Sequence, residues 1–323
     1  MPVPSGPLSL GNIQTEYGGS NPASLSEYYR GASSSSTVPN QTSAGTYGTI
    51  PTSGAISMGT FRSKGKFVFN ATISTNTTDY NISSAATSAG WDGSETLIAS
   101  VTINAGVYVY ATTTSAYALD TGSSFPGGHY IAITNNGLIV GRGGAGGTGG
   151  GSNASSALAA VAGSAGGPAL RAQVAVEVTN NGTIGGGGGG GGGGASVWLA
   201  DGDKSGTTTY SASGGGGGGG RANGTAGVRG TAAGTDIIAN NGANGTAGAL
   251  TTVGAGGAGS TGFGWAGGNG GAGGALGTAG SSGLASTGGT SGGVGAGGGG
   301  GAAVVGNANI TWVVTGTRLG ALT

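Results

Sequence analysis

The chain has 323 residues, of which 83 are glycine, while only 6% are charged and 6% are aromatic. Ordinary globular proteins do not have this composition. Ten basic and ten acidic residues are scattered singly, so the formal net charge is zero and no basic patch could neutralise a row of phosphates. Nucleic acid is therefore not an expected partner, and the absence of cysteine excludes disulfides, thiol nucleophiles and zinc–thiolate sites.

Targeting signals are absent from the sequence. The first 30 residues contain no basic start followed by an apolar run, and no stretch of 18 consecutive apolar residues occurs anywhere. The sequence thus predicts neither a secretion signal nor membrane insertion. We expect a soluble chain that is synthesised in the cytoplasm.

Residues 1–32 contain two short helical patterns. In the first, Ser9 is a suitable N-cap, Gly18 and Gly19 form a stop, and three apolar residues have helical spacing: Leu10, Ile13 and Tyr17. In the second, Ser24 and Glu27 match a capping box. Leu25, Tyr28 and Tyr29 give this segment one apolar face, and Arg30 follows them. Such short helices are unstable alone, so they need a docking surface in this chain or on a different protein.

The sequence of residues 33–140 predicts a small all-β domain that follows a serine-rich link. Four stretches alternate apolar with polar or small residues and are rich in Val, Ile, Tyr and Thr: 66–73, 96–103, 106–114 and 129–137. We interpret them as strands of a sandwich or jelly-roll-like domain.

An internal repeat joins this region to the glycine-rich part. The stretches 130–147 and 174–190 both read as an alternating strand, Thr-Asn-Asn-Gly, an apolar residue and a glycine run. A weaker copy covers 236–249. Asn-Gly favours the positive φ of a tight turn, so each copy predicts a strand that reverses and then leads into glycine.

The glycine runs of residues 141–323 have a period of three. In 141–151 the side chains of Arg142, Ala145 and Thr148 recur at every third residue, and 266–277 repeats the pattern. Three residues per turn is the period of the left-handed polyproline II helix. The side chains then share one edge, which leaves two bare edges where neighbouring backbones can approach and exchange hydrogen bonds.

Other segments reverse the pattern. Residues 224–230 and 242–248 keep glycine at every third position with two side chains between, so we expect them outside the bundle. A single polyglycine helix would not be stable, because ordering it costs conformational entropy that nothing offsets. Many such helices packed side by side could form backbone hydrogen bonds with one another. The sequence therefore predicts a polyglycine II helix sandwich, with the ten glycines of 185–194 as one rod.

Enzymatic sites are poorly supported. No glycine run is followed by the Lys-Ser/Thr of a phosphate-binding loop, the ten carboxylates form no recognisable acid–base pair, and His129 has no visible catalytic partner. Asp201 to Gly206 matches the start of a calcium loop, but Ala212 stands where the bidentate acid should be. A polar turn is the default interpretation, and we expect no enzyme activity, no metal site and no cofactor.

The loops between glycine runs carry the remaining chemistry. Residues 195–213 and 261–268 hold large aromatic and charged side chains where rods turn around. Such side chains on rigid turns form recognition surfaces, although the two tryptophans could equally cap the bundle hydrophobically.

The opening LSLGNIQTEYGGSNPASLSEYYRGA resembles the amino-terminal segment of many tailed-bacteriophage virion proteins. The NNG-x-I-GGGG units and the ending GNANITWVVTGTRLGALT resemble phage tail-fibre and tail-tip proteins. The glycine-rich half is also similar in style to adhesins that cap the long tail fibres of T-even-like phages. In those adhesins, stacked polyglycine II helices carry loops that contact a host outer-membrane protein.

This resemblance implies a virion protein with an attachment segment, a β-rich spacer and a distal head. The attachment residues would be Leu10, Ile13, Tyr17, Leu25, Tyr28, Tyr29 and Arg30. The receptor-contact loops would present Trp198, Asp201, Lys204, Tyr210, Phe263 and Trp265. Expected partners are other tail or fibre proteins and a host cell-surface protein or glycan, and fibre proteins are commonly homotrimers.

Three functions remain open at this point. The leading hypothesis is a non-enzymatic adhesin that binds a host receptor at the end of a tail fibre or tail tip. The alternative is a structural component, such as a collar, capsid or tail decoration fibre, in which the rods are a durable spacer. A depolymerase would need paired acids that the sequence does not supply.

Overall fold

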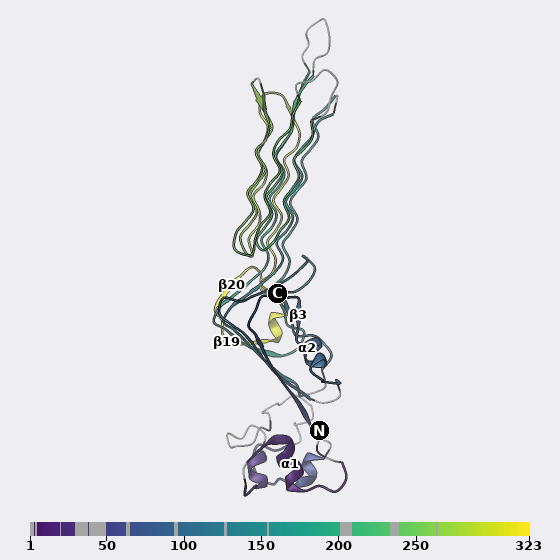
Figure 1. Cartoon of the computed structure of the whole chain (residues 1–323), viewed down its shortest axis with the longest axis vertical. Coiled ribbons are helices and arrows are strands. Elements are labelled where there is room, and N and C mark those ends of the chain that lie inside the picture. The colour runs from purple at the N-terminus through teal and green to yellow at the C-terminus, as the bar shows by residue number, and fades with distance from the viewer. Residues whose placement is uncertain are drawn as a thin grey trace.

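The computed structural model describes residues 3, 5–19, 21–29, 38, 50–62, 65–93, 96–125, 128–153, 155–200, 209–232, 239–262 and 264–323. Three parts follow one another along the longest axis of the molecule: a small helical base, a β-rich middle and a bundle of long glycine-rich rods (Figure 1). The described residues contain two α-helices and many strands, which confirms the expected all-β class.

The base contains α1 (Leu10–Tyr17) and the 3-10 helices η1 (Leu25–Tyr28) and η2 (Met58–Phe61). Ser9 caps α1 as predicted, and the side chain of Asn12 bonds back to the Ser9 amide, which closes a capping box. The predicted second helix is the single 3-10 turn η1, where Ser24 accepts a hydrogen bond from the Ser26 amide.

The middle is built from strands that pair in parallel. The first sheet contains β1 (Lys66–Ile73), β4 (Thr96–Ile103), β7 (Tyr130–Asn135), β10 (Val176–Asn180) and β19 (Ile310–Val314). The second contains β2 (Thr77–Thr78), β5 (Tyr108–Tyr110), β8 (Leu138–Val140), β11 (Thr183–Gly185) and β20 (Thr317–Leu319). The third contains β3 (Tyr80–Asn81), β6 (Leu119–Asp120), β9 (Leu170–Arg171) and β18 (Val304–Val305).

The chain visits these three sheets in turn, so successive passes stack into a three-sided parallel coil. The predicted antiparallel sandwich or jelly roll is therefore wrong in topology, although its strands are correctly placed. The side chains that alternate inward fill the interior of the coil, including Leu97, Ile131 and Val178. The helix α2 (Ile82–Ser88) adds Ile82 and Ala86 to this core.

The Thr-Asn-Asn-Gly repeats form corners of the coil, not reversals. Residues 134–137 lead from β7 to β8, and 179–182 lead from β10 to β11 one pass later. Neither Gly137 nor Gly182 has a positive φ, contrary to the expected turn. Glycine is required because a Cβ on Gly182 would lie 2.0 Å from the carbonyl oxygen of Gly137.

The rods are insertions at one corner of the coil. The chain leaves after β8 and returns at β9, and it leaves again after β11 and returns at β18. Residues 141–169 and 186–303 thus form the bundle, while β10 pairs with β7 across the expected boundary near Gly141 and β19 pairs in turn with β10. Glycine-rich and β-rich parts alternate along the chain, so a division at Gly141 stays a prediction about domains.

Backbone hydrogen bonds hold the rod 185–195 on every side. Its amides donate, three residues apart, to carbonyl oxygens of three neighbouring segments: 161–167, 215–221 and 278–284. Its carbonyls accept with the same spacing from three others: 141–150, 268–277 and 295–301. The rod therefore has six neighbours, and a Cβ at any of residues 186–194 would lie within 2.0 Å of a neighbouring backbone oxygen.

The second pure glycine run, 214–220, has the same surroundings. It donates to 144–150, 243–246 and 268–274, and it accepts from 191–194, 224–230 and 254–257. Outer rods need fewer glycines, because only their inner edges meet a neighbour. In 224–230 the glycines Gly224, Gly227 and Gly230 face the bundle, which confirms the expected outer position.

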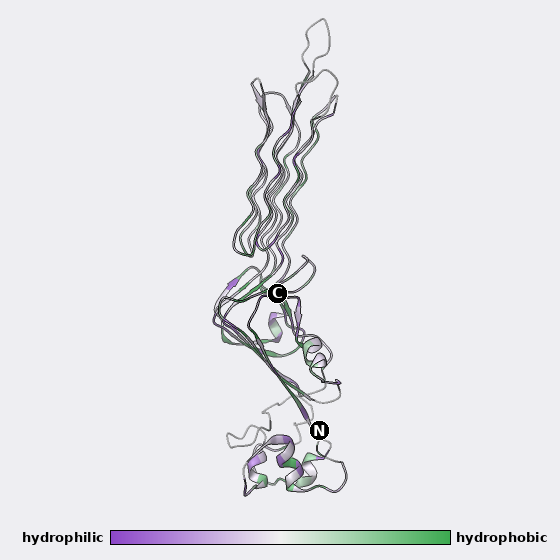
Figure 2. Cartoon of the chain, in the orientation of Figure 1, coloured by the Kyte–Doolittle hydropathy of each residue, from purple (hydrophilic) through white to green (hydrophobic). Residues whose placement is uncertain are grey.

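Hydropathy differs between the coil and the rods. The coil and the base carry the strongly hydrophobic segments, whereas the rods are pale over most of their length (Figure 2). Apolar burial thus stabilises the coil, and backbone pairing between close-packed glycines stabilises the rods.

Candidate functional site

The candidate site is the end of the bundle farthest from the helical base (Figure 1). Six short strands lie here, and we call the surface that they form the tip: β12 (Val197–Ala200), β13 (Thr209–Ala212), β14 (Ala239–Asn240), β15 (Thr261–Gly262), β16 (Trp265–Ala266) and β17 (Thr290–Ser291). Each strand continues a rod, so the bundle fixes the backbone positions from which the tip side chains project.

Strand pairing organises the tip into one small sheet and one hairpin. β12 pairs antiparallel with β13 and β17, and β14 adds to β13 in parallel. β15 and β16 form the separate hairpin. The side-chain amide of Asn240 donates to the carbonyl oxygen of Thr261 at 2.8 Å, which ties the sheet to the hairpin.

Two of the predicted receptor-contact residues come together across these elements. The rings of Tyr210 on β13 and Trp265 on β16 lie 4.7 Å apart between centroids and are tilted by 47°. Both side chains are only partly buried. Their contact was not predicted, because a sequence separation of more than 50 residues gives no signal of proximity. The Asn240 link, between residues 21 apart in the sequence, was not predicted either.

Trp198 lies on β12, opposite Ser211 and Thr290, and is also partly buried. Its neighbour Leu199 is 37% exposed and was not predicted as a contact residue. Asp201, Lys204 and Phe263, together with the calcium-like stretch 201–206, lie outside the described residues.

The part of the chain that the structure describes has no cluster of three or more His, Cys, Asp or Glu that could hold a metal ion. His129 lies instead on the coil, where its ring contacts Phe125 at 5.2 Å between centroids. None of the helices described has the length and hydropathy needed to cross a bilayer.

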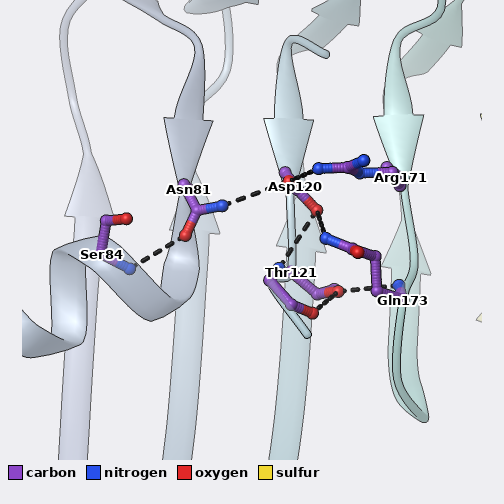
Figure 3. Close-up of polar contacts among 7 residues, drawn as sticks. Asn81, Ser84, Asp120, Thr121, Arg171 and Gln173 are labelled. Carbon is purple, nitrogen blue, oxygen red and sulfur yellow. Dashed lines mark hydrogen bonds and ion pairs between the residues drawn. The ribbon is translucent and has the colours of Figure 1, made fainter. Parts of the chain in front are cut away.

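The clearest charged cluster lies on the third sheet of the coil (Figure 3). The Asp120 carboxylate accepts hydrogen bonds from Asn81 at 3.2 Å, Arg171 at 2.5 Å and Gln173 at 2.9 Å. Burial acts to raise the pKa of Asp120, but these bonds and the Gly122 amide outweigh it and hold the pKa below its usual range. Because every oxygen is occupied, the cluster stabilises neighbouring strands and is not a reactive site.

The predicted attachment residues lie in the base. Ile13, Tyr17 and Tyr28 are fully buried with Phe61 in a cluster of the chain's own residues. Leu10 and Leu25 pack against that cluster, and the Tyr29 hydroxyl donates to the carbonyl oxygen of Gly54. These side chains thus dock within the chain, one of the two options left open, while Arg30 lies outside the described residues.

The chain thus combines a helical base, a parallel coil and a bundle of rods that ends in the tip. We compared its sequence and its fold with those of known proteins. The family model of the phage tail fibre adhesin Gp38 matches residues 68–323. The chain belongs to the Gp38 family of phage tail fibre adhesins. This membership fits the resemblance seen in the sequence and favours an adhesin over a collar, capsid or decoration fibre.

One solved structure supports the fold of this adhesin over its whole length. The crystal structure of the gp37–gp38 adhesin tip complex of the bacteriophage S16 long tail fiber matches with a TM-score of 0.57 and 24% sequence identity. The match covers 99% of this chain and 100% of the other. A search of curated protein sequences finds no significant match.

Proposed function

We propose that the chain is a non-enzymatic receptor-binding adhesin of a phage tail fibre, and that the tip is the surface that touches the host. The observation that carries the proposal is the Tyr210–Trp265 pair, which two separate strands hold at the end of the bundle. Partly exposed aromatic rings on a rigid support offer contact area at little further entropic cost.

The rods would serve this function as polyglycine II helices. Hydrogen bonds repeat at every third residue, and the two pure glycine runs each have six neighbours, as a hexagonal array of such helices requires. A cross-linked array resists bending, so it would hold the tip in a fixed geometry away from the virion.

The base would serve as the attachment segment. The S16 structure that shares this fold contains a gp37 chain beside gp38, and a comparable tail fibre protein is the partner that we propose for this chain. The host partner would be a cell-surface protein or glycan. Because Tyr17 and Tyr28 are buried within the base, its exposed surface would make the attachment contact instead of these two side chains.

The test is adsorption of phage that carry a variant adhesin. Trp265→Ala combined with Tyr210→Ala should reduce the adsorption rate constant by at least about tenfold, equivalent to about 1.4 kcal/mol of binding free energy. Trp312→Ala on the coil is the matched control, because it removes a partly buried tryptophan far from the tip.

Two conditions make the result decisive. Both variants must assemble into virions and keep a thermal unfolding transition close to that of the wild type. Normal adsorption of the Tyr210–Trp265 double variant under those conditions would refute the role of this pair.

A further inference from the structure

A second concave site lies where the coil meets the rods, at the opposite end of the bundle from the tip. The loop between β5 and β6 lies here beside three rods and forms with them an open pocket of about 220 Å³. Its polar lining comes from Thr112, Thr113 and Thr114 of the loop and from Arg142, Ser164 and Thr225 of the rods.

Arg142 is the only charged residue in this lining. It occupies the outer edge of the rod 141–151, where the equivalent later positions are the small neutral residues Ala145 and Thr148. Its guanidinium group makes no hydrogen bond or ion pair with another of the described residues. A positive charge with five donors therefore stands unneutralised beside the pocket.

Hydroxyl groups line the same pocket as this charge. Those of Thr114, Ser164 and Thr225 make no hydrogen bond within the part of the chain that the structure describes, so they are available as donors. Among the described residues, no carboxylate belongs to the lining. The carboxylate of Asp79, which contacts the lining residue Thr112, is held by the Thr112 amide at 2.9 Å and the Thr112 hydroxyl at 2.5 Å.

We propose that this pocket binds a small oxyanion, as phosphate or as the phosphate group of a sugar phosphate. A planar guanidinium group pairs with phosphate oxygens through two parallel hydrogen bonds, and hydroxyl donors complete the shell. With about 30 Å³ for each water of liquid, the pocket has the space of about seven waters, which is enough for a phosphate and part of a sugar ring.

The site is distinct from the proposed receptor surface. Arg142 closely follows β8 of the coil, whereas the tip lies at the end of the bundle farthest from the base (Figure 1). Binding here would also depend on the coil and the rods together, since the loop between β5 and β6 and three rods each contribute donors. An oxyanion would then link the bundle to the coil.

The test is isothermal titration of the full chain with inorganic phosphate and, separately, with glucose 1-phosphate, at constant ionic strength. Arg142→Gln removes the charge. Arg229→Gln is the matched control, because Arg229 is an exposed arginine on the outer rod 224–230 that does not line the pocket. Thr225→Glu is a second variant, which places a competing carboxylate beside Arg142.

We expect saturable binding to the wild type and to Arg229→Gln, at least about tenfold weaker binding to Arg142→Gln, and none to Thr225→Glu. Tighter binding of glucose 1-phosphate than of phosphate identifies a sugar phosphate as the ligand, and equal binding identifies free phosphate. Equal affinities of wild type and Arg142→Gln, or no heat of binding at millimolar concentrations of both probes, would overturn the proposal. Thermal unfolding of each variant checks the fold.

Discussion

At the scale of single residues, Gly189 and Gly299 differ although both lie in glycine runs of neighbouring rods. A Cβ on Gly189 would come within 1.9 Å of the carbonyl oxygen of Gly298, whereas a Cβ on Gly299 would meet no atom within 4 Å. Glycine is thus a steric requirement at one position and dispensable at the other.

This contrast gives a matched pair of variants. Gly189→Ala should lower the thermal unfolding midpoint strongly, at a cost beyond the about 1–3 kcal/mol of ordinary overpacking, because the obstacle is backbone on a cross-linked rod. Gly299→Ala should leave the midpoint unchanged or raise the free energy of unfolding by about 0.4–1 kcal/mol, since alanine restricts the unfolded chain. Circular dichroism melts of both variants give the two midpoints. Equal midpoints would contradict close packing around the run 185–194.

Asp120 makes stability depend on pH. Its pKa is lowered in the folded chain by Arg171, Gln173 and the Gly122 amide, against the raising effect of burial. A carboxyl whose folded pKa lies below its unfolded value of about 3.9 contributes stability that is complete above that value. The contribution is lost as the pH falls through the lower, folded pKa.

We therefore expect Asp120→Asn to reduce the free energy of unfolding by about 1.5–3 kcal/mol at pH 7, the range for hydrogen bonds to charged groups. The difference from the wild type should shrink as the pH falls below about 4. Urea unfolding at several pH values measures both quantities. A difference that stays constant down to the acid limit would show that the charge of Asp120 contributes nothing.

At the scale of elements, the corners of the coil depend on stacked asparagines. The Asn135 side chain donates to the side-chain oxygen of Asn180 at 2.8 Å and accepts from the Gly137 amide at 3.1 Å. Asn180 donates in turn to the carbonyl oxygen of Thr315 at 2.9 Å. A second pair, Asn136 and Asn181, stacks outside the corner in solvent.

Asn135→Ala should therefore cost about 2–3 kcal/mol, because it leaves buried polar groups of Asn180 and Gly137 without partners. Asn136→Ala removes an equivalent bond at an exposed position and should cost less than about 0.5 kcal/mol. Urea unfolding of the two variants, monitored by tryptophan fluorescence, compares the buried and the exposed asparagine of one corner. Similar losses of unfolding free energy would mean that burial does not determine how much the asparagine stack stabilises the protein.

These corners also show where sequence interpretation stops. Alternation places Val176 and Val178 on a buried face, but one buried face is shared by parallel and antiparallel sheets, so the topology of the coil did not follow. Thr-Asn-Asn-Gly by itself predicts a reversal of the chain, because Asn-Gly often forms the turn of a hairpin. Its recurrence one pass later, where Asn135 meets Asn180, is the signal of a stacked corner.

The rods were predictable in more detail, because their steric rule is local. A side chain at every third residue, as with Arg142 and Ala145, marks a rod with one free edge, and an unbroken run marks a rod surrounded by six others. The tip was predictable only as a set of loops. The contact between Tyr210 and Trp265 depends on which rods are neighbours, and the pure glycine runs carry no side chains that could specify neighbours from the sequence.

At the scale of the whole molecule, the coil organises the bundle. Each insertion leaves and re-enters the coil at adjacent points: the Gly167 amide donates to the carbonyl oxygen of Arg142 at 2.7 Å, and the Gly301 amide donates to that of Gly187 at 2.8 Å. The entropic cost of closing each long insertion is therefore met by pairing its first and last residues beside a folded corner. Neighbouring rods then add bonds with the spacing already fixed.

This arrangement predicts that the coil folds without the rods. Replacing residues 143–166 and 188–300 by short Gly-Ser-Gly links should leave a soluble β-rich protein with a cooperative thermal transition, because the main apolar cluster lies within the coil and its helix and loops. The rods alone should not fold, since their interior is glycine backbone with little apolar surface to bury.

Circular dichroism and size-exclusion chromatography of the shortened chain and of residues 186–303 alone test both parts of this prediction. A shortened chain that is unfolded, or isolated rods that melt cooperatively, would show that the rods template the coil instead.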